Sequence, residues 1–503
     1  LPFFHCEFAH AMGNGPGGLE DYRTLMYDTD MYFGGCVWEL VNHSVAIGDI
    51  YKNPKYTYGG DFGDTPNSGT FCVPTLCNPN PTPGVGMLEL KQAYRPIEAS
   101  FADAENGKIK IRSRRYYTDL SDVSLYWSFE NDGVVTASGI IESLDVPANE
   151  EREYTLDYSN SPRRGVRTLT LSFRQKNHTP WAEAGYEICF TQLILDTIEE
   201  TSYLGPMRAV SSIELEEGER YVNITAGETE YVFDKHKAQL ISLKDNGKEF
   251  LAAPIRATVW RAPTDNDKAF KKEWIAAGIN NIGVKCYECS VSDINEKYVK
   301  IKAKVSFGSH SVKPIAFADL TFCVNCDGTC ALDYKVELCT KDDLPLPRFG
   351  IELTMPEGME YAKYFGYGDI ESYSDKHSAS KLGLYATTAH KNHVPYIYPQ
   401  ENGSHYGCKW AAVGSATAHG LRFTSDTGDF CFNISHYNAK QLTEAKHEYE
   451  LVPNKETTVQ IDYKQNGIGS ASCGPIPAKE VLFCEKNFSF HVHISPEYVT
   501  NLF

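Results

Sequence analysis

The hydrophobic pattern of this chain changes its period near residue 100. Before that point the segments follow the order strand, loop, helix, strand. They are an apolar run at 1–6, a glycine-rich loop at 13–18, a helical stretch from 19 to about 26 and a second apolar run at 36–41. This order makes a βαβ unit, the building block of parallel sheets and barrels. An irregular region rich in Gly and Pro follows at 58–85, and then a helix that Pro96 ends.

From about residue 100 onward, apolar and polar residues alternate with period two. Clear examples are 108–112 and 123–129, and turn residues such as Asn131-Asp132-Gly133 separate such segments. Alternating strands joined by short turns are typical of β-sandwiches. We expect one sandwich at 100–200. The remaining 201–503 is too long for a single sandwich and predicts a larger two-sheet domain.

The first 99 residues supply only part of a barrel. A complete (β/α)₈ barrel takes about 250 residues and eight βα units, whereas the pattern here offers two before the chain becomes all-β. The chain also opens inside an apolar run, Leu1-Pro2-Phe3-Phe4. We therefore expect a multidomain, mostly β chain that starts with the C-terminal βα units of a TIM barrel, and we expect the true N-terminus to lie upstream.

Charge and composition exclude several classes of ligand. The formal net charge is −18, which argues against nucleic acid and anionic lipid because both attract a positive field. No run of 18 apolar residues exists, so we expect no membrane span. The 15 cysteines lie mostly in apolar or alternating segments. This use of cysteine predicts free thiols in a reducing compartment and hence a cytoplasmic location.

Three residues near the N-terminus have the types of side chain that a sugar-binding site needs. Glu7 stands where the first strand ends, His10 follows three residues later, and Trp38 lies at the end of the next strand. In barrel enzymes the C-terminal strand ends carry the catalytic groups. A pyranose needs polar partners for its hydroxyls and a flat apolar surface for its C–H face. By itself, however, a glutamate at a strand end is more often solvated or salt-bridged.

Longer motifs connect these residues to a known family. The run Cys-Glu-Phe-Ala-His-Ala-Met-Gly-Asn at 6–14 is followed by Gly-Gly-Cys-Val-Trp at 34–38 and by a Gly/Asp-rich loop at 58–67. Further anchors are Trp-Arg-Ala-Pro-Thr-Asp-Asn-Asp at 260–267 and the segments 364–368, 371–373, 396–403 and 432–435. In this order, and over almost the whole chain, they resemble the β-galactosidases of glycoside hydrolase family 2.

The resemblance implies roles for individual residues. Glu7 matches the nucleophile that forms a galactosyl-enzyme, and His10 matches a residue that binds galactose hydroxyls and steadies the transition state. Trp38 matches the aromatic wall beside the ring, Cys473 a loop residue that contacts the aglycone, and Asn14 a further substrate-binding residue. The resemblance also implies an immunoglobulin-like sandwich at 100–200 and a β-supersandwich of the galactose-mutarotase type at 201–503.

The resemblance further implies two metal cofactors. Asn67 falls near the family's active-site Mg²⁺, whose main ligands lie upstream of Glu7, and the backbone carbonyl of Phe71 matches a ligand of Na⁺. Pro74 stands where an Asn or Asp usually donates a side-chain oxygen to sodium, so the chain departs from the family pattern at that site. The acid/base carboxyl of the family also lies upstream.

We therefore expect the intact protein to hydrolyse terminal β-D-galactosides such as lactose with retention. We expect this chain alone to be inactive, since it contributes the nucleophile without the acid/base. The expected partners are the N-terminal region or subunit and further copies in a homo-oligomer. The alternative is a non-catalytic complementing subunit, or the carbohydrate-binding portion, of a split β-galactosidase.

Other patterns in the chain fit different chemistry less well. His5-Cys6-Glu7 matches the H-x-E half of a zinc deaminase, but the Pro-Cys-x-x-Cys half is missing. Cys323, Cys326 and Cys330 have spacings seen in zinc sites. They flank an expected hairpin, where alternate side chains point to opposite faces, so we expect core thiols instead. We expect His43 to be a surface residue or to support the site from behind.

Overall fold

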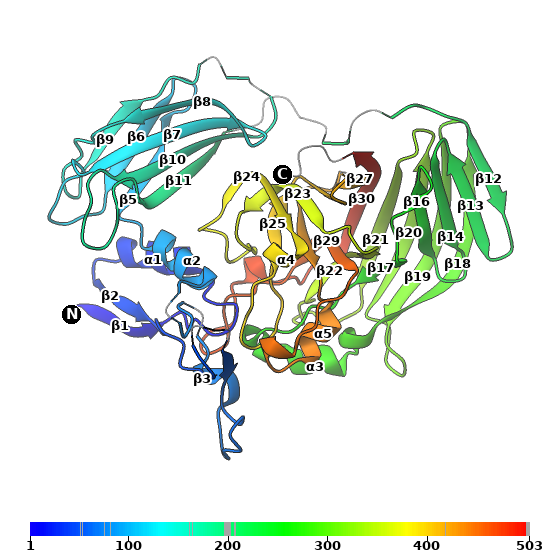
Figure 1. The fold of residues 1–503 in the computed structure, drawn as a ribbon, viewed down its shortest axis with the longest axis horizontal. Coiled ribbons are helices and arrows are strands. Elements are labelled where there is room, and N and C mark those ends of the chain that lie inside the picture. Colours follow the sequence, from blue (N-terminus) through cyan, green and yellow to red (C-terminus); the bar gives the residue numbers. More distant parts are fainter. Residues whose placement is uncertain are drawn as a thin grey trace.

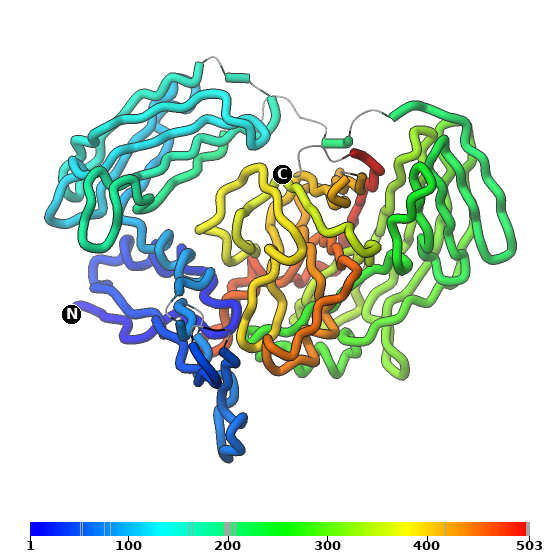
Figure 2. The backbone as a smooth tube through the Cα atoms, in the orientation of Figure 1, coloured from blue at the N-terminus to red at the C-terminus, as the bar shows by residue number. Residues whose placement is uncertain are grey.

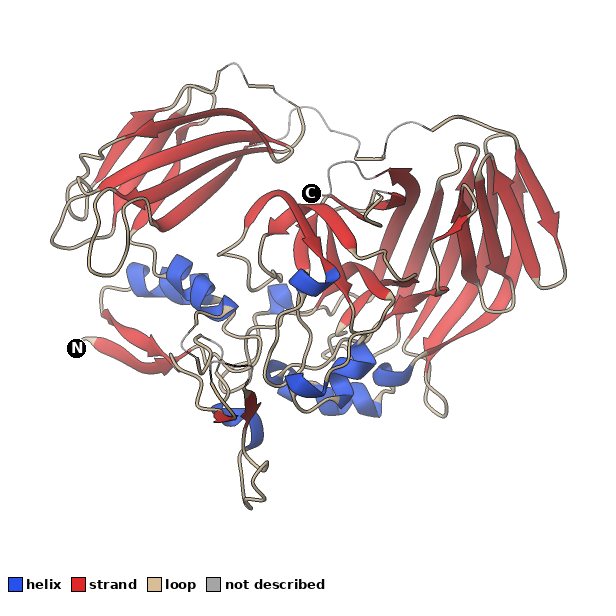
Figure 3. Cartoon of the chain, in the orientation of Figure 1, coloured by secondary structure: helices blue, strands red, loops and turns tan. Residues whose placement is uncertain are grey.

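The computed structural model describes residues 1–503 except 51, 53, 75, 81, 160, 163, 196–202, 206–207, 418 and 499–503. Its three parts follow the chain: an N-terminal part that contains two helices, a β-sandwich, and a large β domain (Figure 1). Strands dominate, and the helices are few and short (Figure 3). None of the described helices is long and apolar enough to cross a membrane.

The N-terminal part is built on a two-stranded parallel sheet. Strand β1 (Phe3–Phe8) pairs with β2 (Tyr32–Val37), and helix α1 (Leu19–Asp28) connects them. The predicted βαβ order is thus present, but β2 begins and ends four residues before the predicted 36–41. The predicted strand starts directly after Gly34 and Gly35, whereas both glycines lie within the observed strand. A Cβ at Gly35 would lie 2.7 Å from the carbonyl oxygen of His5, so the close neighbouring strand accounts for this glycine.

Short elements complete this part. The strands β3 (Val45–Ile47) and β4 (Lys55–Thr57) form a small hairpin. Helix α2 (Val85–Ala93) then packs against α1 and leads into the sandwich. The first sandwich strand begins at Ile97, directly after this helix.

The sandwich packs a three-stranded sheet against a four-stranded sheet. Its core comes from alternate residues of both, including Ile109, Leu125 and Leu171, all fully buried. The immunoglobulin-like topology stays a prediction. The sheets have the order β5 (Ile97–Asp103), β6 (Lys108–Ser113), β9 (Glu151–Thr155) and the order β11 (Glu187–Leu195), β10 (Arg167–Gln175), β7 (Val123–Asn131), β8 (Val134–Ile141).

The large domain contains three sheets rather than the predicted two, because its first five strands pair only with one another. That sheet has the order β12 (Ile213–Glu217), β13 (Tyr221–Ala226), β14 (Thr229–Asp234), β15 (Gln239–Asp245), β16 (Lys248–Glu249). The second has the order β17 (Ala253–Thr258), β22 (Arg348–Met355), β29 (Thr457–Gln465), β28 (Phe430–Ser435), β25 (His405–Cys408).

The third sheet has nine strands and begins and ends with antiparallel hairpins. All three sheets share one continuous apolar core, to which Val222, Val299 and Ile351 contribute. The short helices α3 (Lys271–Ala276), α4 (Ala389–Asn392) and α5 (Ala439–Glu444) lie in the connections. The order of the nine strands is β18 (Gly283–Ile294), β19 (Tyr298–Gly308), β20 (Ala316–Asn325), β21 (Cys330–Leu338), β30 (Asn487–Tyr498), β27 (His419–Thr424), β26 (Trp410–Gly414), β23 (Tyr361–Gly368), β24 (Lys381–Thr388).

A buried carboxyl lies between the N-terminal part and the large domain. Glu89 of α2 is only 3% exposed. Burial raises its pKa to about 7, although Lys376 and the backbone N–H of Ala379, both in the large domain, favour the charged form. Below this pKa the carboxyl is neutral, and above it the folded protein holds a buried negative charge.

This carboxyl makes stability depend on pH. Its folded-state pKa of about 7 exceeds the ordinary 4.5, so its contribution to stability is lost as the pH rises from 4.5 through 7. In Glu89→Gln this loss disappears. We expect the variant and the wild type to have similar melting temperatures at pH 4.5, and the variant to be more stable at pH 8 by about 3 kcal/mol.

Thermal unfolding between pH 4.5 and 8 measures this difference. Glu153→Gln, at an exposed position of β9, is the matched control and should follow the wild type throughout. If Glu89→Gln followed the wild type as well, the buried carboxyl would not carry the expected charge.

Candidate active site

Glu7 is exposed near the end of β1, and the loop that follows it folds back against the large domain. Two glycines permit this contact. Gly13 has a φ of +57°, and a Cβ there would lie 2.7 Å from Oε1 of Gln400. A Cβ at Gly17 would lie 2.8 Å from the Cα of Gly469. The two backbones therefore approach as closely as their atoms allow, and Figure 2 shows the late-chain segment beside the N-terminal part.

A cavity of about 830 Å³ opens beside Glu7. Glu7 and His10 line it from the N-terminal part, and Cys473 lines it from a loop more than 460 positions later in the chain. Asp375 and Glu480 add negative charge from the large domain. The fold thus brings three of the predicted site residues into one cavity that neither part could form alone.

His10 lies in the wall of this cavity with one ring nitrogen free. It is buried, its Nδ1 lies 3.4 Å from Oγ of Ser472, and its ring centroid is 5.1 Å from that of Phe71. Its Nε2 has no hydrogen-bond partner among the described residues. Burial lowers the pKa of His10, and the carboxylate of Glu7 opposes this only in part. The lowered pKa favours the neutral imidazole, and its buried Nε2 is a polar atom left without a partner among the described residues.

Trp38 lies next to the nucleophile loop rather than in the cavity wall. Its backbone N–H donates to the carbonyl of Phe8 (3.3 Å), and its carbonyl accepts from the N–H of Ala11 (2.6 Å). Its side chain is 41% exposed. These backbone bonds fix Trp38 beside the segment that carries Glu7 and His10.

Asn14 does not line the cavity, because its polar atoms contact the large domain. Its backbone N–H donates to Oε1 of Gln400 (2.9 Å), and its Nδ2 donates to the carbonyl of Glu401 (3.0 Å). Its Oδ1 accepts from Nζ of Lys376 (2.7 Å), which also pairs with Glu371 at 3.0 Å. The substrate contact that the resemblance implies stays a prediction, whereas the observed contacts hold the loop.

Sequence reasoning assigned no role to Lys376, Gln400 or Glu371. Two of them, Glu371 and Gln400, fall within the motifs at 371–373 and 396–403, so a signal was present. Lys376 gave none, because a lysine that is buried and paired cannot be told from a surface lysine by its sequence neighbours.

The residues expected near metal ions do not gather ligands. The Oδ1 of Asn67 accepts from the N–H of Gly69, and its Nδ2 donates to the carbonyl of Asp64, in an exposed loop. Among the described residues, no group of three His, Cys, Asp or Glu ligands includes a neighbour of Asn67. Phe71 is 42% exposed, and Pro74 pairs in a β-bridge with Met12. Around Asn67, the described residues thus do not compose a magnesium site by themselves.

The remaining candidates lie outside the cavity. His43 has an exposed side chain with Nδ1 3.5 Å from a carboxylate oxygen of Glu39. Cys323, Cys326 and Cys330 are free thiols, and they are not among the groups of the described residues that could hold a metal ion.

Comparisons with known families divide the chain in the same three parts. Residues 1–99 match the glycosyl hydrolases family 2 TIM barrel domain, residues 109–196 match β-galactosidase domain 4, and residues 225–494 match the β-galactosidase small chain.

Curated relatives are similar over nearly the whole chain. A β-galactosidase of Actinobacillus pleuropneumoniae is 34% identical over 97% of this chain and 47% of its own length. A β-galactosidase of Staphylococcus xylosus is 33% identical over 94% of this chain and 47% of its own length. The chain thus spans about half the length of the curated relatives it matches.

Among solved structures, galactose 1-epimerase from Lactobacillus acidophilus matches over 57% of this chain, with 7% identity and a TM-score of 0.32. This similarity is too low to support an argument about the fold, so the mutarotase-like topology stays a prediction. The small-chain family, by contrast, matches more than half of the chain. The chain belongs to the β-galactosidases of glycoside hydrolase family 2.

Proposed function

We propose that this chain forms part of a retaining β-galactosidase that removes terminal, non-reducing β-D-galactose residues from lactose-type substrates. The observation that carries the proposal is the cavity in which Glu7, His10 and Cys473 meet. Family membership supports the substrate class, and the cavity offers a carboxylate, an imidazole and the loop that carries Cys473.

In the first step, the Glu7 carboxylate attacks the anomeric carbon of galactose while the bond to the aglycone oxygen breaks. A second carboxyl, about 5–5.5 Å away in retaining enzymes, gives its proton to the leaving oxygen. In the second step, the same group takes a proton from water, and the water oxygen displaces Glu7 from the anomeric carbon. Galactose leaves with its configuration retained, and we assign the second carboxyl to residues outside this chain.

Two residues orient the substrate in this proposal. The Nε2 of His10, buried and without a partner among the described residues, bonds a galactose hydroxyl, and the lowered pKa of His10 favours the neutral ring. Cys473 faces the aglycone from the late-chain loop. Trp38 would reach the ring from beside the nucleophile segment.

The metal ions belong to the complete protein in this proposal. Mg²⁺ would take its main ligands from outside the chain, with Asn67 nearby, and Na⁺ would use the carbonyl of Phe71 without help from Pro74. No step above depends on either ion. Homo-oligomer formation and a cytoplasmic location likewise stay predictions.

The exposed face of the two-stranded sheet supports a partner for this part. Phe4 and Phe33 lie on one face with ring centroids 6.2 Å apart and are 49% and 77% exposed, and exposed apolar surface of this kind marks a contact site. We propose that further βα units of the barrel cover this face.

The second candidate function, a complementing subunit of a split enzyme, uses the same face. If it is correct, mixing this chain with an N-terminal half should give one stable complex on gel filtration and restore hydrolysis.

Mechanism-based labelling tests the role of Glu7. A 2-deoxy-2-fluoro-galactosyl inactivator with a good leaving group forms a stable ester on the nucleophile, and intact-mass spectrometry detects it. We expect one label per chain, mapped to Glu7, in the complex with the N-terminal region. We expect at least a 1,000-fold slower reaction for Glu7→Gln, because the amide is a very poor nucleophile.

Asp21→Asn is the matched control, because Asp21 is another carboxylate of the same cavity. It should label at nearly the wild-type rate. A label on a different carboxylate, or no label in the complete complex, would contradict the assignment of Glu7.

A further inference from the structure

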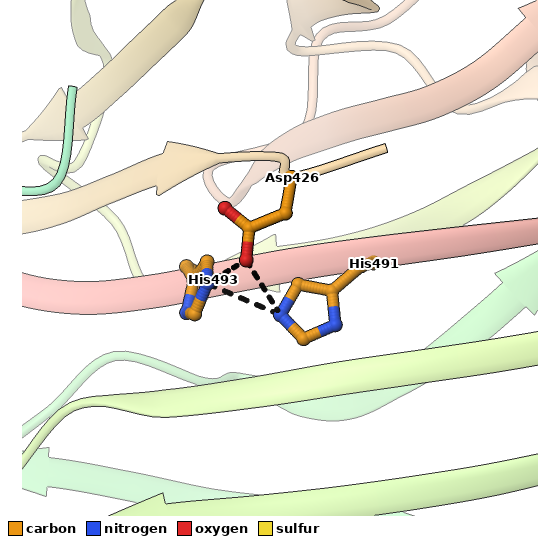
Figure 4. A group of neighbouring side chains, drawn as sticks. All are labelled: Asp426, His491 and His493. Carbon is orange, nitrogen blue, oxygen red and sulfur yellow. Dashed lines mark hydrogen bonds and ion pairs between the residues drawn. The ribbon is translucent and has the colours of Figure 1, made fainter. Parts of the chain in front are cut away.

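Three potential metal ligands converge on the nine-stranded sheet. His491 and His493 lie two residues apart on β30, so their side chains point to the same face. Asp426 follows β27, the strand that pairs with β30 through Thr424 and His493. Figure 4 shows the carboxylate and the two imidazoles directed toward one another. None of the three lines the cavity beside Glu7.

The distances between the ligand atoms suit a single ion. The Nε2 atoms of the two histidines are 3.1 Å apart, and Oδ2 of Asp426 is 2.9 Å from Nε2 of His493 and 3.7 Å from Nε2 of His491. A circle through these three atoms has a radius of about 1.9 Å, so a point about 2.1 Å from all of them exists, the usual length of zinc bonds to nitrogen and oxygen.

Hydrogen bonds alone cannot explain why these three atoms lie so close together. A protonated Nε2 of His493 can donate to Asp426, but it then has no lone pair to accept a hydrogen bond from His491. An unprotonated Nε2 can accept from His491, but its lone pair then faces the carboxylate oxygen at 2.9 Å. A metal ion that accepts a lone pair from each of the three atoms removes both conflicts.

The surroundings leave room for a further ligand. The side chains of His491 and His493 are 23% and 21% exposed, and that of Asp426 is 67% exposed. Asp333 pairs with His491 across the neighbouring strand and adds negative charge. In addition, the backbone N–H of His491 donates to Oγ1 of Thr427, so the turn that carries Asp426 is already attached to β30.

We propose that Asp426, His491 and His493 bind a divalent transition-metal ion, of which Zn²⁺ fits best. Two imidazoles select Zn²⁺ and its neighbours over Mg²⁺ and Ca²⁺, which prefer oxygen ligands. Three protein ligands leave a fourth position for water or for a group of another molecule. The ion joins the turn after β27 to the last strand of the described chain and stabilises the large domain when bound.

Metal titration of the 503-residue chain tests this site without measuring activity. After removal of metals with a chelator, Co²⁺ should produce visible ligand-field bands at one ion per chain, and Zn²⁺ should displace it. In His491→Gln/His493→Gln we expect the affinity to fall by more than about 100-fold. Asp426→Asn, which keeps an oxygen but loses the charge, should give a smaller loss.

Two controls make the result specific. His310→Gln/His390→Gln removes two exposed histidines elsewhere and should bind Co²⁺ like the wild type. Cys473→Ser should also do so, which excludes this exposed thiol as the Co²⁺ ligand. Unchanged affinity in His491→Gln/His493→Gln would overturn the proposal, as would the absence of Co²⁺ bands in the correctly folded wild type at millimolar metal.

Discussion

The buried contact between Asn14 and Lys376 is the interaction on which the candidate active site depends. Lys376 and its partner Glu371 are both inaccessible to solvent. A buried charge is stable only when it is paired and hydrogen-bonded, and removing one partner of such a pair typically costs about 3–5 kcal/mol. By donating to Oδ1 of Asn14, the ammonium group joins this ion pair to the loop that follows the nucleophile strand.

The same region of the large domain holds the two loops that face each other across the cavity. The carboxylate of Asp375 accepts from the N–H groups of Ile468 and Gly469, and its carbonyl accepts from the N–H of Gly18. Gly17 then donates to the carbonyl of Gly469 at 2.7 Å. The position of Cys473 relative to Glu7 therefore depends on contacts of the large domain with both loops.

Much of this architecture could be predicted from local patterns. Period-two alternation identified the β-rich parts because one face of each strand is buried, and the order of segments before residue 100 predicted the βαβ unit. The register of β2 could not be predicted, since Gly34 and Gly35 resemble a turn until the neighbouring strand is known. The contacts of Asn14 were missed for the same reason: its partners lie more than 360 residues away. Asp426 and His491 likewise come together only through the pairing of β27 with β30.

Hydrogen exchange of the nucleophile loop tests the central claim most directly. Replacing the ion pair with neutral side chains, Glu371→Gln/Lys376→Met, loosens the contact without leaving a buried charge unpaired. If the large domain holds this loop, the backbone amides of Asn14, Gly17 and Gly18 should exchange at least about tenfold faster in the variant. In the control Lys381→Met, which breaks the pair with Glu187 at the sandwich, they should not change. Unchanged exchange of these amides in the double variant would show that the loop keeps its structure without the Lys376–Glu371 pair, and would contradict the account.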